Sequence, residues 1–239
     1  MNIQKKPDVT LVLACYNEAP IFEQSVARIR EAMDAGKFSY EIIFVDDAST
    51  DRTPTLIRNI CQRASLYRAF FHPINQGRGK TVADGVMRAR GTVVGYIDID
   101  CEVSPVYIPF MVSQILHKKA DIVTGKRYYR TSFVSLYREV ISRGYQRISD
   151  LMLGTGGMDT ETGYKFFDRK KILPILKTVE NTGWFWDTEI MVRAKRAGLR
   201  IAEVPVLFIR RFDKHSSVHV FRDSVAYLTN LWEFRNKKI

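Results

Sequence analysis

The sequence predicts a single α/β domain in which a mostly parallel β-sheet is flanked by helices. Short apolar runs that favour buried strands alternate with amphipathic, helix-like stretches through the first hundred residues. With 239 residues and 46% apolar composition, the chain can form one large core but is too short for two ordinary domains. In such a sheet, ligands bind at the carboxyl ends of the parallel strands.

The first half of the chain carries the regular alternation. Each predicted strand is an apolar run, and the runs cover residues 9–14, 41–45, 67–71 and 92–97. Phe22, Val26 and Ile29 recur at helical spacing after the first strand, which predicts a helix there. Residues 53–64 repeat this pattern after the second strand. The order is that of consecutive βαβ units.

The second half is less regular. The predicted helices cover residues 105–117, 187–197 and 217–235, with one or two more within 132–153. The predicted strands cover residues 121–124, 164–167 and 201–208. No internal repeat or linker interrupts the sequence, which favours one domain over residues 1–239.

Charge and cysteine content limit the partners and the compartment. The formal net charge of +11 favours an anionic partner, which could be nucleic acid, anionic lipid or a phosphorylated substrate. Cys15, Cys61 and Cys101 are odd in number and lack C-x-x-C spacing, which fits a reducing compartment without zinc or disulfides. No apolar run approaches the roughly 20 residues that cross a bilayer, so we expect a soluble or peripheral protein.

Polar side chains follow the first two predicted strands. Tyr16, Asn17 and Glu18 come directly after the first strand, and Asp46 and Asp47 directly after the second. Two acids beside a buried strand are costly unless a positive or hydrogen-bonding group meets them, which favours a ligand site. The alternative is a helix start that is capped by the following serine or threonine, with both acids solvated.

A glycine-rich segment precedes another predicted helix. Gly77, Arg78 and Lys80 place two cations in a flexible loop that could face a diphosphate. The spacing of glycines and lysine differs from that of a P-loop. The alternative is an ordinary loop with solvated cations.

Three acids lie two positions apart after the fourth strand. In an extended chain, residues two apart point the same way, so Asp98, Asp100 and Glu102 would present carboxylates on one side. Parallel carboxylates repel unless a cation lies between them, and such oxygen ligands suit Mg²⁺ or Mn²⁺. The alternative is a solvated strand end.

Charged residues also cluster in the second half. Arg127 follows the fifth predicted strand, and a C-terminal basic group contains Arg210, Arg211 and Lys214. Guanidinium groups bind phosphate in bidentate geometry, although each of these residues could equally belong to a solvated basic face. Asp187 follows three consecutive aromatic residues in the sequence and lies at a predicted helix start. A carboxylate is favourable at that position even without a ligand.

Taken in order, these segments resemble the family 2 glycosyltransferases, especially the branch of dolichyl- and polyprenyl-phosphate hexosyltransferases that includes the dolichyl-phosphate mannose synthases. The resemblance rests on residues 16–18, 45–53, 75–79, 98–100 and 125–128. It implies a GT-A fold, in which about residues 1–102 form a Rossmann-like, nucleotide-sugar-binding half. About residues 103–239 would form the acceptor-binding half with a C-terminal amphipathic helix. Arg52 replaces the family's usual glycine, so the donor's base and hexose stay open.

The resemblance also implies roles for individual residues. The positions that match the donor-binding motifs are Tyr16, Asn17, Glu18, Asp46, Asp47, Gly77, Arg78, Lys80 and Asp98. The implied ligands of Mg²⁺ or Mn²⁺ are Asp98, Asp100 and Glu102. The candidate catalytic residues are Asp98, Asp100, Arg127 and Asp187, and the candidate acceptor-phosphate residues are Arg127, Arg210, Arg211 and Lys214.

The expected chemistry is inverting transfer of a hexose from a UDP- or GDP-sugar to a polyprenyl or dolichyl phosphate. Such an acceptor is largely ionised at neutral pH and needs no strong general base. If the acceptor is instead a sugar hydroxyl in a cell-wall or capsular polysaccharide, Asp187 is the candidate base. A basic nucleic-acid-binding domain is a third interpretation, but no nucleic-acid-binding motif occurs, so we expect no nucleic acid partner.

The last predicted helix could bind a membrane surface. The helix carries apolar residues beside Arg222 and Arg235, so it could lie in a lipid interface or pack on the core. These apolar residues are Val218, Phe221, Val225, Leu228, Leu231 and Trp232. We expect a cytoplasmic protein that is peripheral on the cytosolic face of a membrane. Its partners would be a nucleotide-sugar donor and a lipid-phosphate acceptor, with a separate membrane subunit as a further candidate.

Overall fold

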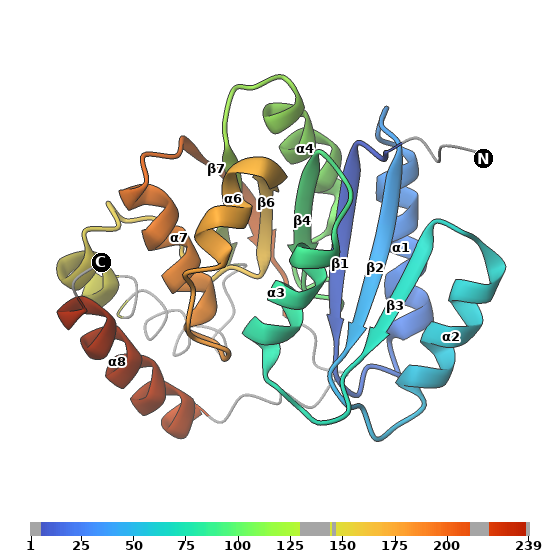
Figure 1. Cartoon of the computed structure of the whole chain (residues 1–239), viewed down its shortest axis with the longest axis horizontal. Coiled ribbons are helices and arrows are strands. Elements are labelled where there is room, and N and C mark those ends of the chain that lie inside the picture. The colour runs from blue at the N-terminus through green and yellow to red at the C-terminus, as the bar shows by residue number, and fades with distance from the viewer. Residues whose placement is uncertain (1–5, 130–143, 145–146, 211–219, 238–239) are drawn as a thin grey trace.

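Seven strands form one central sheet with the order β3-β2-β1-β4-β6-β5-β7 (Figure 1). The computed structural model describes residues 6–129, 144, 147–210 and 220–237. Neighbouring strands run parallel except at β6, which is antiparallel to both β4 and β5. The prediction of an α/β fold with a mostly parallel sheet is therefore confirmed.

All seven predicted strands are present. Their bounds are β1 (Val9–Cys15), β2 (Tyr40–Asp46), β3 (Tyr67–Phe71), β4 (Val93–Ile97), β5 (Ile122–Tyr129), β6 (Tyr164–Asp168) and β7 (Ile201–Phe208). β5 continues past its predicted end at residue 124. Its second half, although rich in cations, pairs in register with β7, and this pairing extends the strand.

The helices differ more from the prediction. They are α1 (Phe22–Asp34), α2 (Thr53–Arg63), α3 (Arg78–Arg88), the 3-10 turn η1 (Pro105–Tyr107), α4 (Ile108–Leu116), α6 (Arg169–Leu176), α7 (Trp186–Arg196) and α8 (Val220–Asn236). The sequence did not predict α6, whose start is charged and whose interior holds Pro174. The side chain of Asp168 caps it by accepting from the amides of Lys170 and Lys171. Within the predicted region 132–153, residues 147–153 are helical and most of the rest lies outside the described residues.

Helices cover both faces of the sheet and create two apolar cores (Figure 1). On one face, Phe22 and Ile29 of α1 and Met111 of α4 pack against the strands. On the other face, Val86 of α3 and Ile190 of α7 close a second core together with residues of α6. The central strands β1, β2 and β4 are buried on both faces, which explains why they appear in the sequence as continuous apolar runs.

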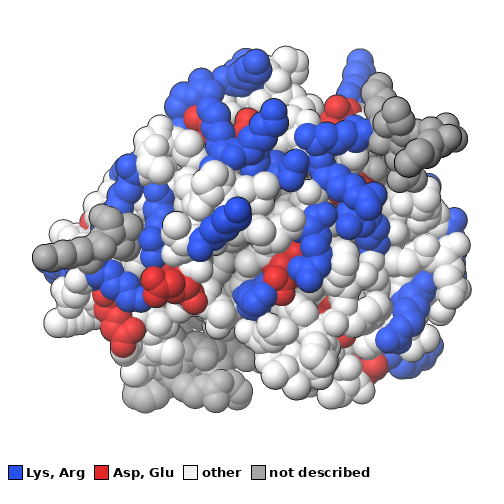
Figure 2. All heavy atoms as spheres, in the orientation of Figure 1, with Lys and Arg blue, Asp and Glu red and all other residues white. Residues whose placement is uncertain are grey.

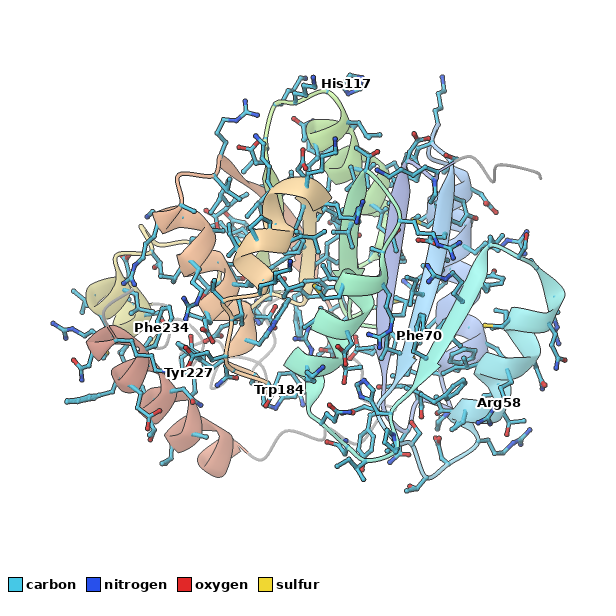
Figure 3. The ribbon with its side chains drawn as sticks, viewed as in Figure 1. Arg58, Phe70, His117, Trp184, Tyr227 and Phe234 are labelled. Atoms are coloured by element: carbon cyan, nitrogen blue, oxygen red, sulfur yellow. The ribbon has the colours of Figure 1, made fainter. Side chains whose placement is uncertain are left out.

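A third apolar cluster attaches α8 to α7. Tyr227 and Phe234 project from α8 toward α7 (Figure 3). Their rings lie 5.4 and 5.7 Å from the ring of Phe185, which precedes α7. Leu231 is fully buried in the same cluster. The last helix is thus packed on the fold through one of its faces.

The carboxyl ends of β1, β2 and β4 lie together at the lower edge of the sheet in Figure 1. Loops from these strands, together with the N-terminal turns of α3 and α7, therefore gather at that edge. Lys and Arg side chains cover more of the face in Figure 2 than acids do, in keeping with the net charge of +11. Across the described parts of the chain, no helix is both long and apolar enough to span a bilayer.

Gly95 leaves no room for a side chain in the middle of the sheet. A Cβ atom at this position of β4 would overlap the ring of Phe166 on β6, and Phe166 is fully buried. We therefore predict that Gly95→Ala lowers the free energy of unfolding by about 1–3 kcal/mol, the usual cost of overpacking. Urea unfolding followed by circular dichroism measures this change. Gly183→Ala is the control, because its Cβ would make only an ordinary contact with Asn181; equal effects of the two variants would contradict the prediction.

Candidate active site at the carboxyl ends of the strands

The guanidinium of Arg78 connects the end of β4 with the start of α7. Its Nη2 donates to Asp98 Oδ1 at 2.6 Å, its Nε donates to the same oxygen at 3.1 Å, and its Nη1 donates to Asp187 Oδ2. It also lies over the rings of Tyr96 and Trp184, 5.7 and 5.4 Å from their centroids. Burial lowers the pKa of Arg78, but the negative charges of Asp187 and Asp98 together raise it by a larger amount. The pKa is therefore shifted upward overall. A fixed positive charge therefore lies between two carboxylates that would otherwise repel each other.

Gly77 directs the chain toward this position. It precedes α3 with a φ of +93°, which side chains rarely allow, and a Cβ would lie 2.8 Å from the carbonyl oxygen of Thr182. Arg78, Gly79 and Lys80 form the first turn of α3, which corrects the prediction of a flexible loop. The helix begins early because Gly79 packs against Trp186 and because the amide of Lys80 donates to Thr182.

Asp98 begins a turn, so the prediction of an extended segment through Glu102 was wrong. β4 ends at Ile97, the amide of Cys101 donates to the carbonyl of Asp98 at 3.2 Å, and Cys101 has a φ of +54°. Exposure nevertheless alternates through the turn. The side chain of Asp98 is 47% exposed, and Asp100 and Glu102 are half-buried, with buried residues between them.

The predicted metal ligands do not form a three-residue cluster. No group of three acidic, histidine or cysteine side chains with metal-binding geometry occurs among residues 6–129, 144, 147–210 and 220–237. Asp100 Oδ1 instead accepts a hydrogen bond from the amide of Glu102 at 3.2 Å. The metal-binding roles of Asp98, Asp100 and Glu102 stay predictions.

Asp187 is completely surrounded by donors. Oδ1 accepts from the Tyr96 hydroxyl and from Lys165 Nζ at 2.9 Å, and Oδ2 accepts from Arg78. Burial raises the pKa of Asp187, but the positive charges of Arg78 and Lys165 together lower it by a larger amount. The pKa is therefore shifted downward overall. These contacts are those of a buried counter-ion, and the predicted role of Asp187 as a base stays a prediction.

The backbone of Gly163 packs closely against the side chains of Asp98 and Arg78. Its carbonyl accepts from the amide of Asp98 at 3.0 Å, and a Cβ on it would overlap both the Asp98 carboxylate and the Arg78 guanidinium. The nearby Lys165 is fully buried and reaches Asp187 from β6. No role was predicted for either residue. Their only signal was the Thr-Gly-Tyr-Lys segment at residues 162–165, which leads into the predicted strand at residues 164–167.

The loops after β1 and β2 are tied to each other. Asn17 Oδ1 accepts from the amide of Thr50 at 2.8 Å, and the amide of Asn17 donates to Ser49 Oγ at 2.9 Å. Neither Ser49 nor Thr50 caps α2, which was the alternative interpretation. Glu18 is buried, whereas Tyr16 is 43% exposed beside these loops. The structure thus brings the predicted polar residues together and assigns Asn17 to holding the loops.

The two adjacent aspartates have different surroundings. Asp47 accepts from the amides of Gln76 and Gly77 at 2.8 and 3.0 Å, so it organises the loop before α3. Asp46 Oδ2 accepts from the amide of Ser49 at 3.1 Å. Asp46 Oδ1 is buried, and no residue in the described part of the chain bonds to it. A buried carboxylate oxygen without a partner is costly, which makes Asp46 the better candidate to meet a ligand.

Arg127 is held by acids that sequence analysis missed. It donates from Nε and Nη2 to Asp159, both at 2.8 Å, and from Nη2 to Glu161 at 3.4 Å. Burial lowers the pKa of Arg127, but the acids beside it, Asp159 first among them, raise it by a larger amount. The pKa is therefore shifted upward overall. Asp159 carried no sequence signal, because its partner lies 32 positions away.

The other predicted cations lie in separate places. Lys80 pairs with Asp84 on its own helix at 2.6 Å. Arg210 follows β7, where the amide of Ile209 donates to the carbonyl of Glu102 at 2.8 Å, so Arg210 lies near the turn after Asp98. Arg211 and Lys214 lie outside the described residues.

The three consecutive aromatic residues before Asp187 divide between core and surface. Phe185 and Trp186 are buried, whereas Trp184 is 45% exposed and lies over Arg78. Figure 3 places Trp184 at the lower edge of the fold, below the start of α3. Only Trp184 of these three is positioned to contact a ligand at this edge.

Comparison with known proteins identifies the family of the chain. Residues 10–174 match the model of the family described as "Glycosyl transferase family 2". The match covers more than half of the chain, and the chain therefore belongs to this family. The resemblance that the sequence motifs indicated is confirmed.

Curated relatives include enzymes that act on dolichyl phosphate. The chain is 31% identical over 203 residues to Glycosyltransferase AglD of Haloferax volcanii and 29% identical over 221 residues to a dolichyl-phosphate beta-glucosyltransferase of Dictyostelium discoideum. A dolichyl-phosphate beta-glucosyltransferase of Trichomonas vaginalis is 27% identical over 211 residues. These alignments cover 82–84% of the chain but only 32%, 67% and 62% of the respective relatives.

Solved structures share the fold. Glucosyl-3-phosphoglycerate synthase of Mycobacterium tuberculosis in complex with UDP superimposes with a TM-score of 0.71 at 20% identity. The same enzyme with Mn²⁺, UDP-glucose and phosphoglyceric acid gives a TM-score of 0.70 at 22% identity. Each comparison covers 96% of this chain and 80% of that structure. At this identity the likeness establishes the fold, and the predicted GT-A fold is confirmed.

The buried charges around Asp187 predict a pH-dependent stability. Asp187→Asn leaves Lys165 and Arg78 without their shared counter-ion, so we expect a loss of about 3–5 kcal/mol in the free energy of unfolding at pH 7. Because the pKa of Asp187 is lowered by folding, its stabilising effect is complete above the unfolded pKa of about 4 and is lost as the pH falls below it. The difference between wild type and variant should therefore shrink below about pH 4.

Urea unfolding at several pH values measures this difference. The control is Asp168→Asn, because asparagine caps a helix about as well as aspartate. A difference between wild type and Asp187→Asn that stays constant down to pH 3 would contradict the assignment of Asp187 as the counter-ion.

Proposed function

We propose that the chain transfers a hexose from a nucleoside diphosphate sugar to a polyprenyl or dolichyl phosphate, with inversion at the anomeric carbon. The observation that carries this proposal is the position of Asp98 at the end of a central strand, half-exposed and paired with Arg78. The dolichyl-phosphate beta-glucosyltransferases among the relatives supply the acceptor class and make glucose the first hexose to test.

The donor would lie across the ends of β1, β2 and β4. Asp46 is our candidate for the base or ribose because one of its carboxylate oxygens is buried without a partner in the described chain. Tyr16, half-exposed beside the loop of Asn17, would lie against the base. About residues 1–102 would then bind the donor, and about residues 103–239 would bind the acceptor.

Asp98 and Asp100 are suited to hold Mg²⁺ or Mn²⁺ with the donor. These ions commonly bind through one or two carboxylates plus substrate phosphates. The half-exposed carboxylate of Asp98 leaves room for such a contact, and Glu102 is a candidate for a further ligand. When bound, the ion would neutralise charge on the departing nucleoside diphosphate.

Arg78 would share this task from within the protein. Its guanidinium is oriented by Asp187 and by the rings of Tyr96 and Trp184, so little reorganisation is required as negative charge develops on the leaving group. Asp187 and Lys165 would keep Arg78 in place from beneath. Asp98 would exchange part of its contact with Arg78 for contact with the donor complex.

The acceptor distinguishes this proposal from its main alternative, transfer to a sugar hydroxyl in a polysaccharide. A phosphate monoester is already ionised near pH 7, whereas a hydroxyl requires a base. Asp187 is fully enclosed by donors and has a lowered pKa, which makes it a poor base. This favours the phosphate acceptor. Arg127, Arg210, Arg211 and Lys214 are the candidate cations for it.

The deciding experiment measures nucleotide release from UDP- and GDP-sugars with Mn²⁺, with and without polyprenyl phosphate. We expect release to be stimulated by the lipid phosphate and to fall at least 100-fold in Asp98→Asn, because the variant removes the carboxylate charge that would hold the ion. Asp168→Asn, at the opposite edge of the sheet, should leave the rate within about twofold. Release that is unaffected by the lipid, or by Asp98→Asn, would refute the proposal.

We further propose that α8 docks on the membrane that carries the acceptor. Tyr227, Leu231 and Phe234 attach the helix to the fold, while Leu228 and Trp232 are 39% and 48% exposed on it. Leu151, on the adjoining helical segment, is 86% exposed. Arg235 is also exposed and would meet anionic headgroups. Val218 and the side chains of Phe221 and Arg222 lie outside the described part of the chain.

Liposome co-sedimentation checks this docking. We expect the wild-type protein to bind vesicles that contain anionic lipid at low salt, and Leu228→Gln combined with Trp232→Gln to weaken binding at least tenfold, because both apolar contacts are lost. Phe110→Gln is the matched control, since Phe110 is 56% exposed on α4 but lies on a different helix. Equal binding by the wild-type protein and the double variant would contradict docking through α8.

A further inference from the structure

His72 lies directly after β3 and connects two acids that belong to different elements. Its Nδ1 is 2.8 Å from Asp47 Oδ1 in the loop after β2, and its Nε2 is 3.1 Å from Asp84 Oδ2 on α3. The side chain is only 8% exposed, so solvent does not satisfy either nitrogen. Its backbone amide donates to the carbonyl of Asp46 at 2.8 Å, which fixes the ring relative to β2.

Both ring nitrogens face carboxylate oxygens, and this determines what the ring must donate. A neutral imidazole carries one N–H and one lone pair, so one of the two carboxylates would meet a lone pair. A ring with hydrogens on both nitrogens satisfies both acids at once. The ring of His72 therefore bridges Asp47 and Asp84. Lys80 and Arg88 hold Asp84 from the other side, at 2.6 and 3.4 Å.

Asp47 transmits this bridge to the loop before α3. Its two oxygens accept from the amides of Gln76 and Gly77, and its carbonyl accepts from Asn75 Nδ2 at 3.2 Å. Residues 76 and 77 are thus attached to one carboxylate that His72 contacts, and Asn75 is attached to the backbone carbonyl of the same residue. Gly77 is followed directly by Arg78, the guanidinium of which pairs with Asp98 and Asp187.

We propose that His72 is a positioning residue for the nucleoside diphosphate sugar, because its ring ties Asp47 to Asp84 and thereby fixes residues 75–77 and the direction of Arg78. The inference rests on the proposed function, since it concerns the same donor site. His72 itself does not reach the donor, because both of its nitrogens are occupied by Asp47 and Asp84. It acts through the loop.

Binding of UDP and GDP to the full chain in the presence of Mn²⁺, measured by calorimetry, tests this role. His72→Leu removes both contacts at similar bulk, and we expect it to raise the Kd of the bound nucleotide about tenfold, equal to about 1.4 kcal/mol. His72→Gln retains an amide that can donate to Asp47, so its Kd should lie between those of wild type and His72→Leu. His117→Gln is the matched control, because His117 is exposed at the far end of the fold (Figure 3).

Steady-state kinetics separates positioning from packing. Positioning predicts that KM for the sugar nucleotide rises about tenfold in His72→Leu while kcat changes less than about threefold, with partial recovery of KM in His72→Gln. Asp84→Asn removes the negative charge from the other end of the bridge and should also raise KM, which keeps the test decisive if His72→Leu does not fold. Unchanged KM in His72→Gln and Asp84→Asn would overturn the inference, as would an equal fall in kcat without partial recovery.

The two proposals fail differently. If the wild-type protein binds nucleotide and the His72 variants bind it equally well, the positioning role is wrong and the proposed function stands. If the wild-type protein binds neither UDP nor GDP, the proposed function is wrong and the inference about His72 falls with it.

Discussion

The charge balance around Arg78 is the interaction on which the whole site depends. Two carboxylates, from the end of β4 and the start of α7, converge on one guanidinium that is mostly withdrawn from solvent. Each group would be costly to bury alone, because removing a charge from water costs several kcal/mol unless it is paired. The arrangement is stable because Lys165, Tyr96 and the backbone of Gly163 complete it.

This balance explains how the surrounding structure is built. Gly77 adopts a positive φ so that α3 can start beside Thr182, and Gly79 lets the helix approach Trp186 closely. Asp47 accepts from backbone amides in the loop before α3 and so helps to position Arg78. This contact is separate from the ion pairs of Arg78 with Asp98 and Asp187. Close packing at Gly77 and Gly79 therefore positions the helix that carries Arg78 at the strand ends. Such preorganisation is what electrostatic stabilisation of a leaving diphosphate requires.

The second half of the chain contains a similar charge cluster. Arg127 is paired with Asp159 and Glu161, and burial raises the pKa of Glu161. Tyr227 connects this region to α8, because its hydroxyl lies 2.9 Å from Thr188 Oγ1 and Thr188 directly follows Asp187. The helix with the exposed apolar residues is thus joined by this hydrogen bond to the helix that carries Asp187.

Residue patterns along the chain were enough to predict the α/β class, all seven strands, most helices and the polar residues at the strand ends. Those features depend on the spacing of apolar residues along a short stretch of chain, and that spacing is visible without a structure. Tertiary structure alone decided the partners. Arg78 and Asp187 are 109 positions apart, His72 joins acids 25 and 12 positions away, and the turn after Ile97 replaced an expected extension. Charge pairing depends on which elements meet in space, and residue spacing along the chain carries no information about that.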